Sequence, residues 1–288
     1  MDMLKRLQAT RYPSIEQRIM PRDAMLYALG LGFGESPLDP NQLKFVYEKD
    51  LQVFPTMAIT LCYPSTGTHS TPNTGLDMRK TLHVFQSFEL AAPIPLDRTL
   101  VGQTRITGVF DKGAGRGILW TYQNLVHDRD SRQLVCILNG ASMSLVGGGS
   151  GGPRGESRPK REFPSRAPDA VCETKTLPQA ALIYRLSGDY NPFHVDPEMA
   201  RQGGFDQPIL HGRCTFGIAG RAIVEAFCDG DGQNLPKMEA RFSSPVFPGE
   251  TIRTEMWRER QGVLFRSHAS DREVLVLDQG YAEFKHTD

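Results

Sequence analysis

An acid, an amide and an imidazole lie within six residues of one another in the second half of the chain, as Asp189, Asn191 and His194. Asn191 followed by Pro192 is typical of a helix start, because asparagine caps the first turn and proline lacks the N–H that this turn leaves unpaired. We therefore expect His194 in a first helical turn, whose positive end disfavours imidazolium and leaves a ring that can accept a proton. An aspartate and a neutral histidine facing one space could bind and activate a water molecule.

The same cluster also has a purely structural interpretation, as a turn with a helix cap and a satisfied histidine. A second stretch, from Pro208 to Gly217, favours chemistry. It opens an apolar helix that we expect to run from Thr215 to about Cys228. At the N-terminus of this helix, Gly212 would leave an N–H free to bind a carbonyl oxygen. A water activator beside a carbonyl donor indicates chemistry next to a thioester or ester.

The segment from Tyr184 to Ala200, together with Leu210 to Gly217, closely resembles the signature of the R-specific 2-enoyl-CoA hydratases, which are MaoC-like dehydratases. The likeness is to the long form, the hydratase unit of the peroxisomal multifunctional enzyme, and it extends from Ala24 to Tyr281. It implies an α+β protein with a double hot-dog fold, in which two curved antiparallel sheets each wrap round a helix. The implied reaction is reversible syn addition of water to a trans-2-enoyl-CoA in fatty-acid metabolism, which gives a (3R)-3-hydroxyacyl-CoA.

The resemblance implies roles for five catalytic residues. Asp189 and His194 would hold and polarise the water, and Asn191 would orient it or the pair. The Gly212 N–H would bind the thioester oxygen. Glu48 matches an acidic residue near the active site of the family, and a solvated helix end explains it equally well. The sequence leaves open which of Asp189 and His194 takes the first proton.

Substrate contacts are carried over from the same resemblance. His83 aligns with a substrate-contacting histidine of the family, and Val84, the next candidate, departs from the glycine that the family usually has there. Lys112 matches a position near the CoA phosphate and is otherwise an ordinary hairpin-turn lysine. Phe242 matches a substrate contact that core packing would also explain. The other candidates lie within the signature itself: Tyr190, Pro192 and Phe193. The implied chemistry needs no metal and no redox cofactor, and coenzyme A is part of the substrate.

Composition narrows the partners and the compartment. The 33 basic and 33 acidic residues cancel, which argues against a broad nucleic-acid surface. Five cysteines without a Cys-x-x-Cys pair indicate neither a disulfide framework nor a zinc site, and they fit a reducing compartment. Neither a signal peptide, a membrane-length apolar run nor a C-terminal peroxisomal signal is evident. We expect a cytoplasmic homodimer whose partner is its acyl-CoA substrate.

The predicted elements follow the same order in two halves, residues 1–146 and 165–288, joined by a Gly/Pro/Arg-rich linker at 147–164. The strands are expected at 81–90, 99–110, 117–126, 134–146, 170–176, 237–242, 251–258, 263–270 and 273–284. Residues 1–20 are polar and predict no regular element, and residues 64–78 predict a loop. Because the catalytic set lies in the second half, and Phe54 to Leu61 replaces a full helix, we expect the first half to provide the acyl-chain pocket.

Three other functions are compatible with parts of the sequence. An acyl-CoA thioesterase could use the same fold, but the spacing of Asp189, Asn191 and His194 argues against it. A non-catalytic acyl-thioester binding module would need neither the acid nor the imidazole. A dehydratase acting on acyl carrier protein would need a basic docking surface, for which Arg154 to Arg161 is a candidate.

Overall fold

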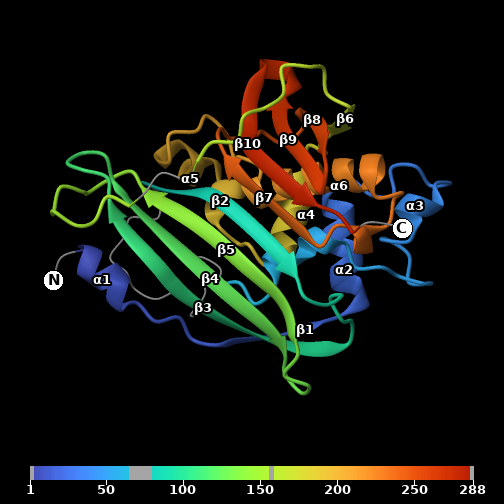
Figure 1. Ribbon diagram of the computed structural model, residues 1–288, viewed down its shortest axis with the longest axis horizontal. Coiled ribbons are helices and arrows are strands. Elements are labelled where there is room, and N and C mark those ends of the chain that lie inside the picture. Colours follow the sequence, from blue (N-terminus) through green and yellow to red (C-terminus); the bar gives the residue numbers. More distant parts are fainter. Residues whose placement is uncertain (1–2, 65–79, 156–158, 286–288) are drawn as a thin grey trace.

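The computed structural model describes residues 3–64, 80–155 and 159–285. Within these residues ten strands form one continuous antiparallel sheet, in the order β1-β3-β4-β5-β2-β7-β10-β9-β8-β6. The green strands of the first half meet the orange and red strands of the second half at the β2–β7 pair (Figure 1). Phe85 of β2 lies opposite Arg241 of β7, and Glu89 lies opposite Lys237. The two predicted sheets are therefore joined edge to edge.

The first half begins with short elements and ends with four long strands. Its helical segments are α1 (Met3–Ala9), α2 (Pro21–Gly30), α3 (Pro40–Leu43) and the 3₁₀ helix η1 (Pro55–Thr60). Its strands are β1 (Ile15–Ile19), β2 (Thr81–Leu90), β3 (Arg98–Asp111), β4 (Ile118–Asp128) and β5 (Leu134–Ser144). The predicted loop at 64–78 lies outside the described residues except for Pro64.

The prediction that residues 1–20 form no regular element is wrong. β1 pairs with the edge of β3, and Leu4 and Leu7 of α1 pack onto Val109 and Trp120 of the sheet. Both elements depend on contacts with a sheet roughly 80 or more residues further along the chain. A local pattern as short as five strand residues does not carry that information.

The second half has its own meander and one long central helix. Its helical segments are α4 (Ala180–Tyr184), η3 (Arg185–Ser187), η4 (Pro192–His194), α5 (Pro197–Gln202), α6 (Gly212–Phe227), η5 (Gly232–Asn234) and η6 (Ser270–Arg272). Its strands are β6 (Ala170–Lys175), β7 (Lys237–Phe242), β8 (Thr251–Glu259), β9 (Gly262–Ala269) and β10 (Val274–Glu283). All nine predicted strands are confirmed, with bounds within two residues of those expected.

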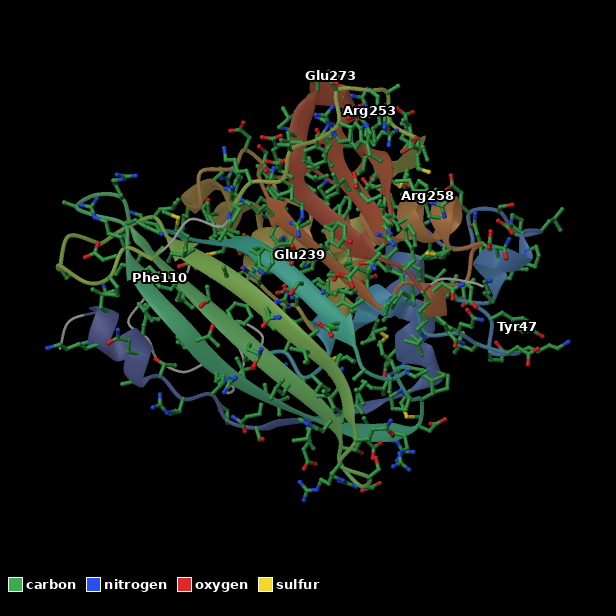
Figure 2. The ribbon with its side chains drawn as sticks, viewed as in Figure 1. Tyr47, Phe110, Glu239, Arg253, Arg258 and Glu273 are labelled. Atoms are coloured by element: carbon green, nitrogen blue, oxygen red, sulfur yellow. The ribbon has the colours of Figure 1, made fainter. Side chains whose placement is uncertain are left out.

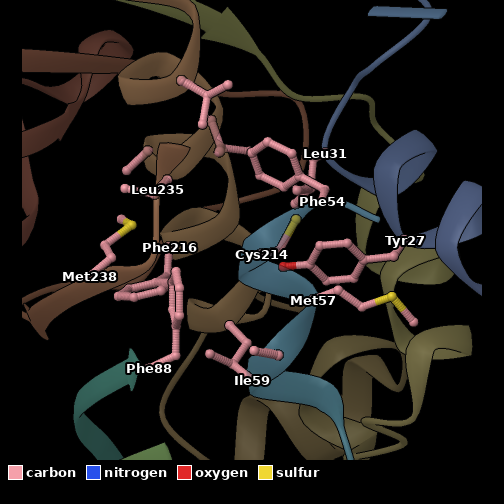
Figure 3. Packing of buried hydrophobic residues seen from close by; sticks show 14 of the residues in the cluster. Tyr27, Leu31, Phe54, Met57, Ile59, Phe88, Cys214, Phe216, Leu235 and Met238 are labelled. Atoms are coloured by element: carbon pink, nitrogen blue, oxygen red, sulfur yellow. The ribbon is translucent and has the colours of Figure 1, made fainter. Parts of the chain in front are cut away.

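Helix α6 is buried from Arg213 to Val224, and it packs against the first half through two glycines. A Cβ on Gly217 would come within 2.6 Å of Leu31, and one on Gly220 within 2.5 Å of Thr56, so only glycine permits these approaches. Figure 3 shows the result, with residues of α2 and η1 gathered around Cys214 and Phe216 of α6. The two halves share one apolar core, which fixes the start of α6 relative to the first-half sheet.

The glycine-rich segment after β5 is held in place rather than loosely suspended. The Asp111 carboxylate accepts backbone N–H groups from Gly149 at 2.7 Å, Ser150 at 2.6 Å and Gly151 at 3.1 Å. Hydrogen bonds from Gly149 and Gly113 lower the pKa of Asp111. The first part of the predicted linker is therefore docked on the end of β3, and residues 156–158 lie outside the described residues. No helix of the described part is both long and apolar enough to cross a membrane.

Candidate active site

The acid, amide and imidazole lie on a short irregular segment between η3 and η4. Gly188 ends η3 with φ of 113°, a left-handed conformation that favours glycine, and the chain then turns to present Asp189. The Asn191 side chain caps η4 by accepting the Phe193 N–H at 3.2 Å, as predicted. The Asp189 carboxylate accepts the Asn191 N–H at 3.4 Å. These local bonds set the positions of all three side chains.

The pKa of His194 is lowered, but the predicted cause, the positive end of a helix, is wrong. η4 is a 3₁₀ turn of three residues, which is too short to have the dipole of a full helix. Burial instead lowers the pKa of His194, against the opposing effects of Asp189 and the Ile209 carbonyl. Its Nδ1 lies 2.8 Å from the Ile209 carbonyl oxygen. Because a carbonyl can only accept, Nδ1 carries the proton and Nε2 keeps a lone pair.

His211 supports both catalytic candidates from behind. Its ring stacks on the His194 ring with centroids 3.6 Å apart, and its Nε2 donates to the Asp189 backbone carbonyl at 3.0 Å. Burial, followed by His194, lowers the pKa of His211 to about 3, so its ring is neutral. These contacts give His211 a structural role, in which it positions the Asp189 backbone and the His194 ring.

Asp189 is ionised beside these neutral rings. Burial alone would raise its pKa, but the opposing electrostatics of the site, which include the Arg213 guanidinium and the Asn191 N–H, lower the pKa below its ordinary value. A carboxylate oxygen of Asp189 and one ring nitrogen from each of His194 and His211 lie within 4.8 Å of one another. Two hydrogen bonds of about 2.8 Å can bridge such a separation through a single water. The pair can therefore hold a water between an anion and a proton-accepting imidazole.

The same three side chains are the kinds of group that ligate metals, but their geometry does not suit an ion. Imidazole lone pairs lie in the ring plane, and the His194 and His211 planes are stacked 3.6 Å apart with a 27° angle between them. A zinc ion requires each nitrogen to point at it from about 2.0–2.1 Å. Stacked rings do not converge in this way, and both Nδ1 of His194 and Nε2 of His211 already face carbonyl oxygens.

A cavity of about 280 Å³ lies in front of Asp189 and His194, with walls from both halves. Gly212 is the first residue of α6, and its N–H has no acceptor among the described residues. The Phe242 ring lies over this glycine, 3.1 Å from where a Cβ would be. A carbonyl oxygen entering the cavity would find the free N–H beside the bound water.

The cavity brings together eight of the twelve site residues predicted from the sequence. They are His83, Val84, Asp189, Asn191, Phe193, His194, Gly212 and Phe242. Tyr190 and Pro192 belong to the same segment but do not line the cavity. Tyr190 is 44% exposed beneath the Arg185 guanidinium, and Pro192 opens η4.

Glu48 and Lys112 lie outside the cavity. Glu48 is exposed in the turns after α3, and its neighbour Tyr47 lies at the right-hand margin of the molecule (Figure 2). Lys112 donates to the Arg154 carbonyl at 2.8 Å and lies over the Phe110 ring, which Figure 2 places at the opposite end. The structure therefore brings neither residue to the catalytic pair. Glu48 lies in a surface turn, and Lys112 binds the segment that follows the docked glycines.

The sequence analysis missed three residues that line the cavity or contact its lining residues: Tyr63, Tyr122 and Arg213. The Arg213 guanidinium lies 3.5 Å from the centroid of the Tyr63 ring and donates to the Tyr122 hydroxyl at 3.4 Å. The Tyr122 hydroxyl lies 3.2 Å from Nε2 of His83, whose pKa burial and Arg213 lower to about 3. The available signal was a charged residue directly after Gly212, at the start of an otherwise apolar helix. Tyr63 and Tyr122 carry no comparable local signal.

A second hollow, of about 360 Å³, lies elsewhere and carries no comparable chemistry. Leu51, Pro55, Leu90 and Ile94 are among its walls, and Lys285 is the one ionisable side chain that lines it. We therefore place the candidate active site in the cavity of about 280 Å³, because Asp189 and His194 line it.

A continuous antiparallel sheet built from two repeats, with an acid–amide–imidazole set beside a free helix N-terminal N–H, defines the class of acyl-thioester hydratases and dehydratases. The sequence matches the MFE-2 hydratase 2 N-terminal domain over residues 18–147 and the MaoC like domain over residues 157–279. The chain belongs to the MaoC-like dehydratase family, in the long form that resembles the hydratase 2 unit of multifunctional enzymes.

Relatives and solved structures agree with this assignment. The chain is 35% identical over 295 residues to the peroxisomal enoyl-CoA hydratase 2 of Arabidopsis thaliana, covering 97% of this chain and 94% of the relative. It is also 35% identical to the mouse peroxisomal multifunctional enzyme type 2 over 281 residues, covering 95% of this chain but only 37% of that enzyme.

Among solved structures, a MaoC-like dehydratase from Phytophthora capsici superposes with a TM-score of 0.85 at 33% identity, over 99% of both chains. A Mycobacterium tuberculosis protein with a double hot-dog fold superposes with a TM-score of 0.64 at 15% identity, over 96% of this chain and 97% of that one. The predicted double hot-dog fold is confirmed, with the two sheets continuous at β2 and β7.

The three buried histidines predict a strong acid sensitivity of the fold. The pKa values of His83, His194 and His211 are all lowered from 6.5 by burial. Below pH 6.5 the unfolded chain takes up protons that the folded chain does not, so the free energy of unfolding falls. The expected loss is up to about 1.4 kcal/mol per histidine for each pH unit. Urea unfolding between pH 7.5 and 5 measures this loss of free energy of unfolding. His83→Gln should reduce the slope of that free energy against pH by about a third. A stability that does not change below pH 6.5 would contradict the buried, neutral state.

Proposed function

We propose that the protein catalyses the reversible hydration of trans-2-enoyl-CoA to (3R)-3-hydroxyacyl-CoA in fatty-acid metabolism. The observation that carries this proposal is the Asp189 carboxylate beside neutral His194, in a cavity that also holds the free Gly212 N–H. The Arabidopsis relative, which the chain matches almost end to end, is named as an enoyl-CoA hydratase. The mouse enzyme is mostly other sequence, so only its hydratase unit is relevant.

In the proposed reaction, Asp189 and His194 hold the water that attacks C3 of the enoyl thioester. The electrons of the C2–C3 double bond move toward the thioester oxygen, and the Gly212 N–H stabilises the charge that develops there. One of Asp189 and His194 takes a proton from the water, and a proton is delivered to C2 from the same side. One hydroxyl is thus added to C3 and one hydrogen to C2. Because both groups lie on one wall of the cavity, the addition is syn.

The chemistry proposed here uses neither a resident metal nor a redox cofactor. The C2–C3 bond is already activated by the thioester, and the protein supplies a proton acceptor and a hydrogen-bond donor. The stacked planes of His194 and His211 support this view, since their lone pairs do not converge on one point.

The test is incubation with crotonyl-CoA in the presence of a chelator, followed by chiral analysis and a thiol assay. We expect loss of the conjugated enoyl absorbance, (3R)-3-hydroxybutyryl-CoA as product and no free thiol. Free thiol would indicate a thioesterase. Binding without turnover would indicate a non-catalytic module, and a (3S) product would contradict the proposed geometry.

A substrate carried on acyl carrier protein is the nearest alternative. Its predicted docking surface is weakened in the structure, because Arg161 pairs with Glu239 and donates to the Gln279 carbonyl at 3.1 Å. We therefore propose CoA as the carrier. Turnover of the crotonyl thioester of acyl carrier protein but not of crotonyl-CoA would reverse this choice.

We also propose a cytoplasmic homodimer. All five cysteines are free, which fits a reducing compartment. Leu182 and Leu186, four residues apart in α4 and η3, are each about half exposed, and a subunit contact would cover them. Light scattering of the purified protein measures its mass in solution, and a monomer would contradict the proposed dimer.

A further inference from the structure

Helix α6 contains two buried arginines with different surroundings. Arg221 is 5% exposed, and Glu225 at 2.7 Å and Glu35 at 3.9 Å neutralise its charge. Arg213 is 4% exposed, yet none of the described carboxylates lies within ion-pair distance of it. A buried charge with no carboxylate at ion-pair distance is costly, and a carboxylate that entered the site would reduce that cost.

The surroundings of Arg213 hold its guanidinium in a fixed orientation. Its flat face lies on the Tyr63 ring at 3.5 Å, and one nitrogen donates to the Tyr122 hydroxyl at 3.4 Å. Because arginine can only donate, the Tyr122 proton is directed to Nε2 of His83, 3.2 Å away. Stacking occupies the face of the guanidinium and leaves the N–H groups at its edge available.

These remaining donors face the cavity. Arg213 is one of the residues that line the cavity. The guanidinium nitrogens without a hydrogen-bond partner are accessible and are not enclosed in the protein interior. The Tyr122 hydroxyl is the one acceptor that it contacts among the described residues. A planar, oriented fork of N–H groups at a cavity wall matches a carboxylate, which accepts two such bonds at once.

Resting on the proposed hydration, we propose that Arg213 is a specificity-determining residue that binds a carboxylate carried by the acyl chain. The preferred substrates are then trans-2-enoyl-CoA thioesters whose acyl chain also bears a free, negatively charged carboxylate. A cavity of about 280 Å³ suits a short acyl group, which places that carboxylate a few carbons from the reacting double bond.

Arg213 also contributes to the lowered pKa of Asp189, so a second role has to be separated from the first. If the guanidinium served only to keep Asp189 ionised, its loss would affect every substrate equally and would move the acid limb of the pH profile. If it binds the substrate carboxylate, its loss affects carboxylated substrates selectively. The ratio of the kcat/KM values for a carboxylated and an uncharged substrate distinguishes the two roles.

The experiment compares two five-carbon thioesters, glutaconyl-CoA, which ends in a carboxylate, and trans-2-pentenoyl-CoA, which ends in a methyl group. The measured quantity is the ratio of their kcat/KM values. The wild-type protein should favour the carboxylated thioester, and Arg213→Met should lower the ratio by at least about 100-fold, as expected on removing one partner of a buried charge pair. Arg213→Lys should restore part of the preference, because it returns the charge without the planar fork.

The matched control is Arg221→Met, which removes the other buried arginine of α6. It should lower the melting temperature and leave the substrate ratio unchanged. An Arg213→Met ratio equal to that of the wild type, or equal losses on both substrates with a shifted acid limb, would overturn the proposal. Wild-type hydration of the methyl-ended but not the carboxylated thioester would also overturn it. Failure to hydrate crotonyl-CoA or either probe would instead refute the proposed function.

Discussion

Asp189→Asn and His194→Ala should each lower the turnover of crotonyl-CoA by about two to four powers of ten, the usual contribution of a positioned proton-transfer group. Asp189 supplies the anion beside the bound water, and His194 supplies the only lone pair that its tautomer leaves free. Steady-state hydration assays measure the loss. Near wild-type activity of either variant would remove that residue from the mechanism.

The fold should survive both substitutions, so that the loss can be assigned to chemistry. Asparagine at position 189 keeps an oxygen that can accept the Asn191 N–H. Position 194 is the last residue of a three-residue turn, and alanine leaves the Asn191 cap of that turn intact. A cooperative urea transition for each variant is the control, and His211→Asn tests separately how much the stacked ring contributes to positioning.

The pH profile gives an independent check on the same pair. The active form needs an ionised Asp189 and a neutral His194, and the pKa values of both groups are lowered. The kcat/KM value should therefore stay level as the pH falls through 6.5, the ordinary pKa of histidine, and decline only at lower pH. A decline centred at or above 6.5 would mean that His194 is not held neutral by burial.

The strands and the catalytic segment could be predicted because their information is local. The alternation of apolar residues in segments such as 81–90 and 237–242 reproduced β2 and β7 residue for residue. Asn191-Pro192 marked the cap, because capping depends on the side chain at one position and the proline that follows it.

Features that depend on distant contacts were not predictable in this way. The continuity of the sheet rests on β2 pairing with β7, which lies about 150 residues further along the chain. The neutrality of His194 comes from burial beneath other segments, not from the turn that contains it. Arg213 could be seen as a charge at the start of an apolar helix, but its unpaired state becomes visible only once Tyr63 and Tyr122 are placed beside it. Glu48 shows the converse, since a matched position in the sequence did not place this residue at the cavity.

The oxyanion donor can be tested by comparing proline with alanine at position 212, because only proline replaces the amide hydrogen with ring atoms. Proline deletes the N–H, whereas alanine keeps it, and both add a Cβ that would lie 3.1 Å from the Phe242 ring. Proline is well suited to the first position of a helix, and His211 before it is extended, with φ of −57° and ψ of 128°. Helix α6 should therefore begin at the same residue in both variants.

Gly212→Pro should lower kcat for crotonyl-CoA by at least about 100-fold relative to Gly212→Ala, equivalent to about 3 kcal/mol of transition-state stabilisation. The comparison with alanine removes the effect of crowding against Phe242, which the two variants share. Circular dichroism establishes that both are folded. Equal turnover by folded proline and alanine variants would mean that the thioester oxygen is held by a donor other than the Gly212 N–H. A selective loss in the proline variant would leave the start of α6 as the place where the negative charge of the reaction is stabilised.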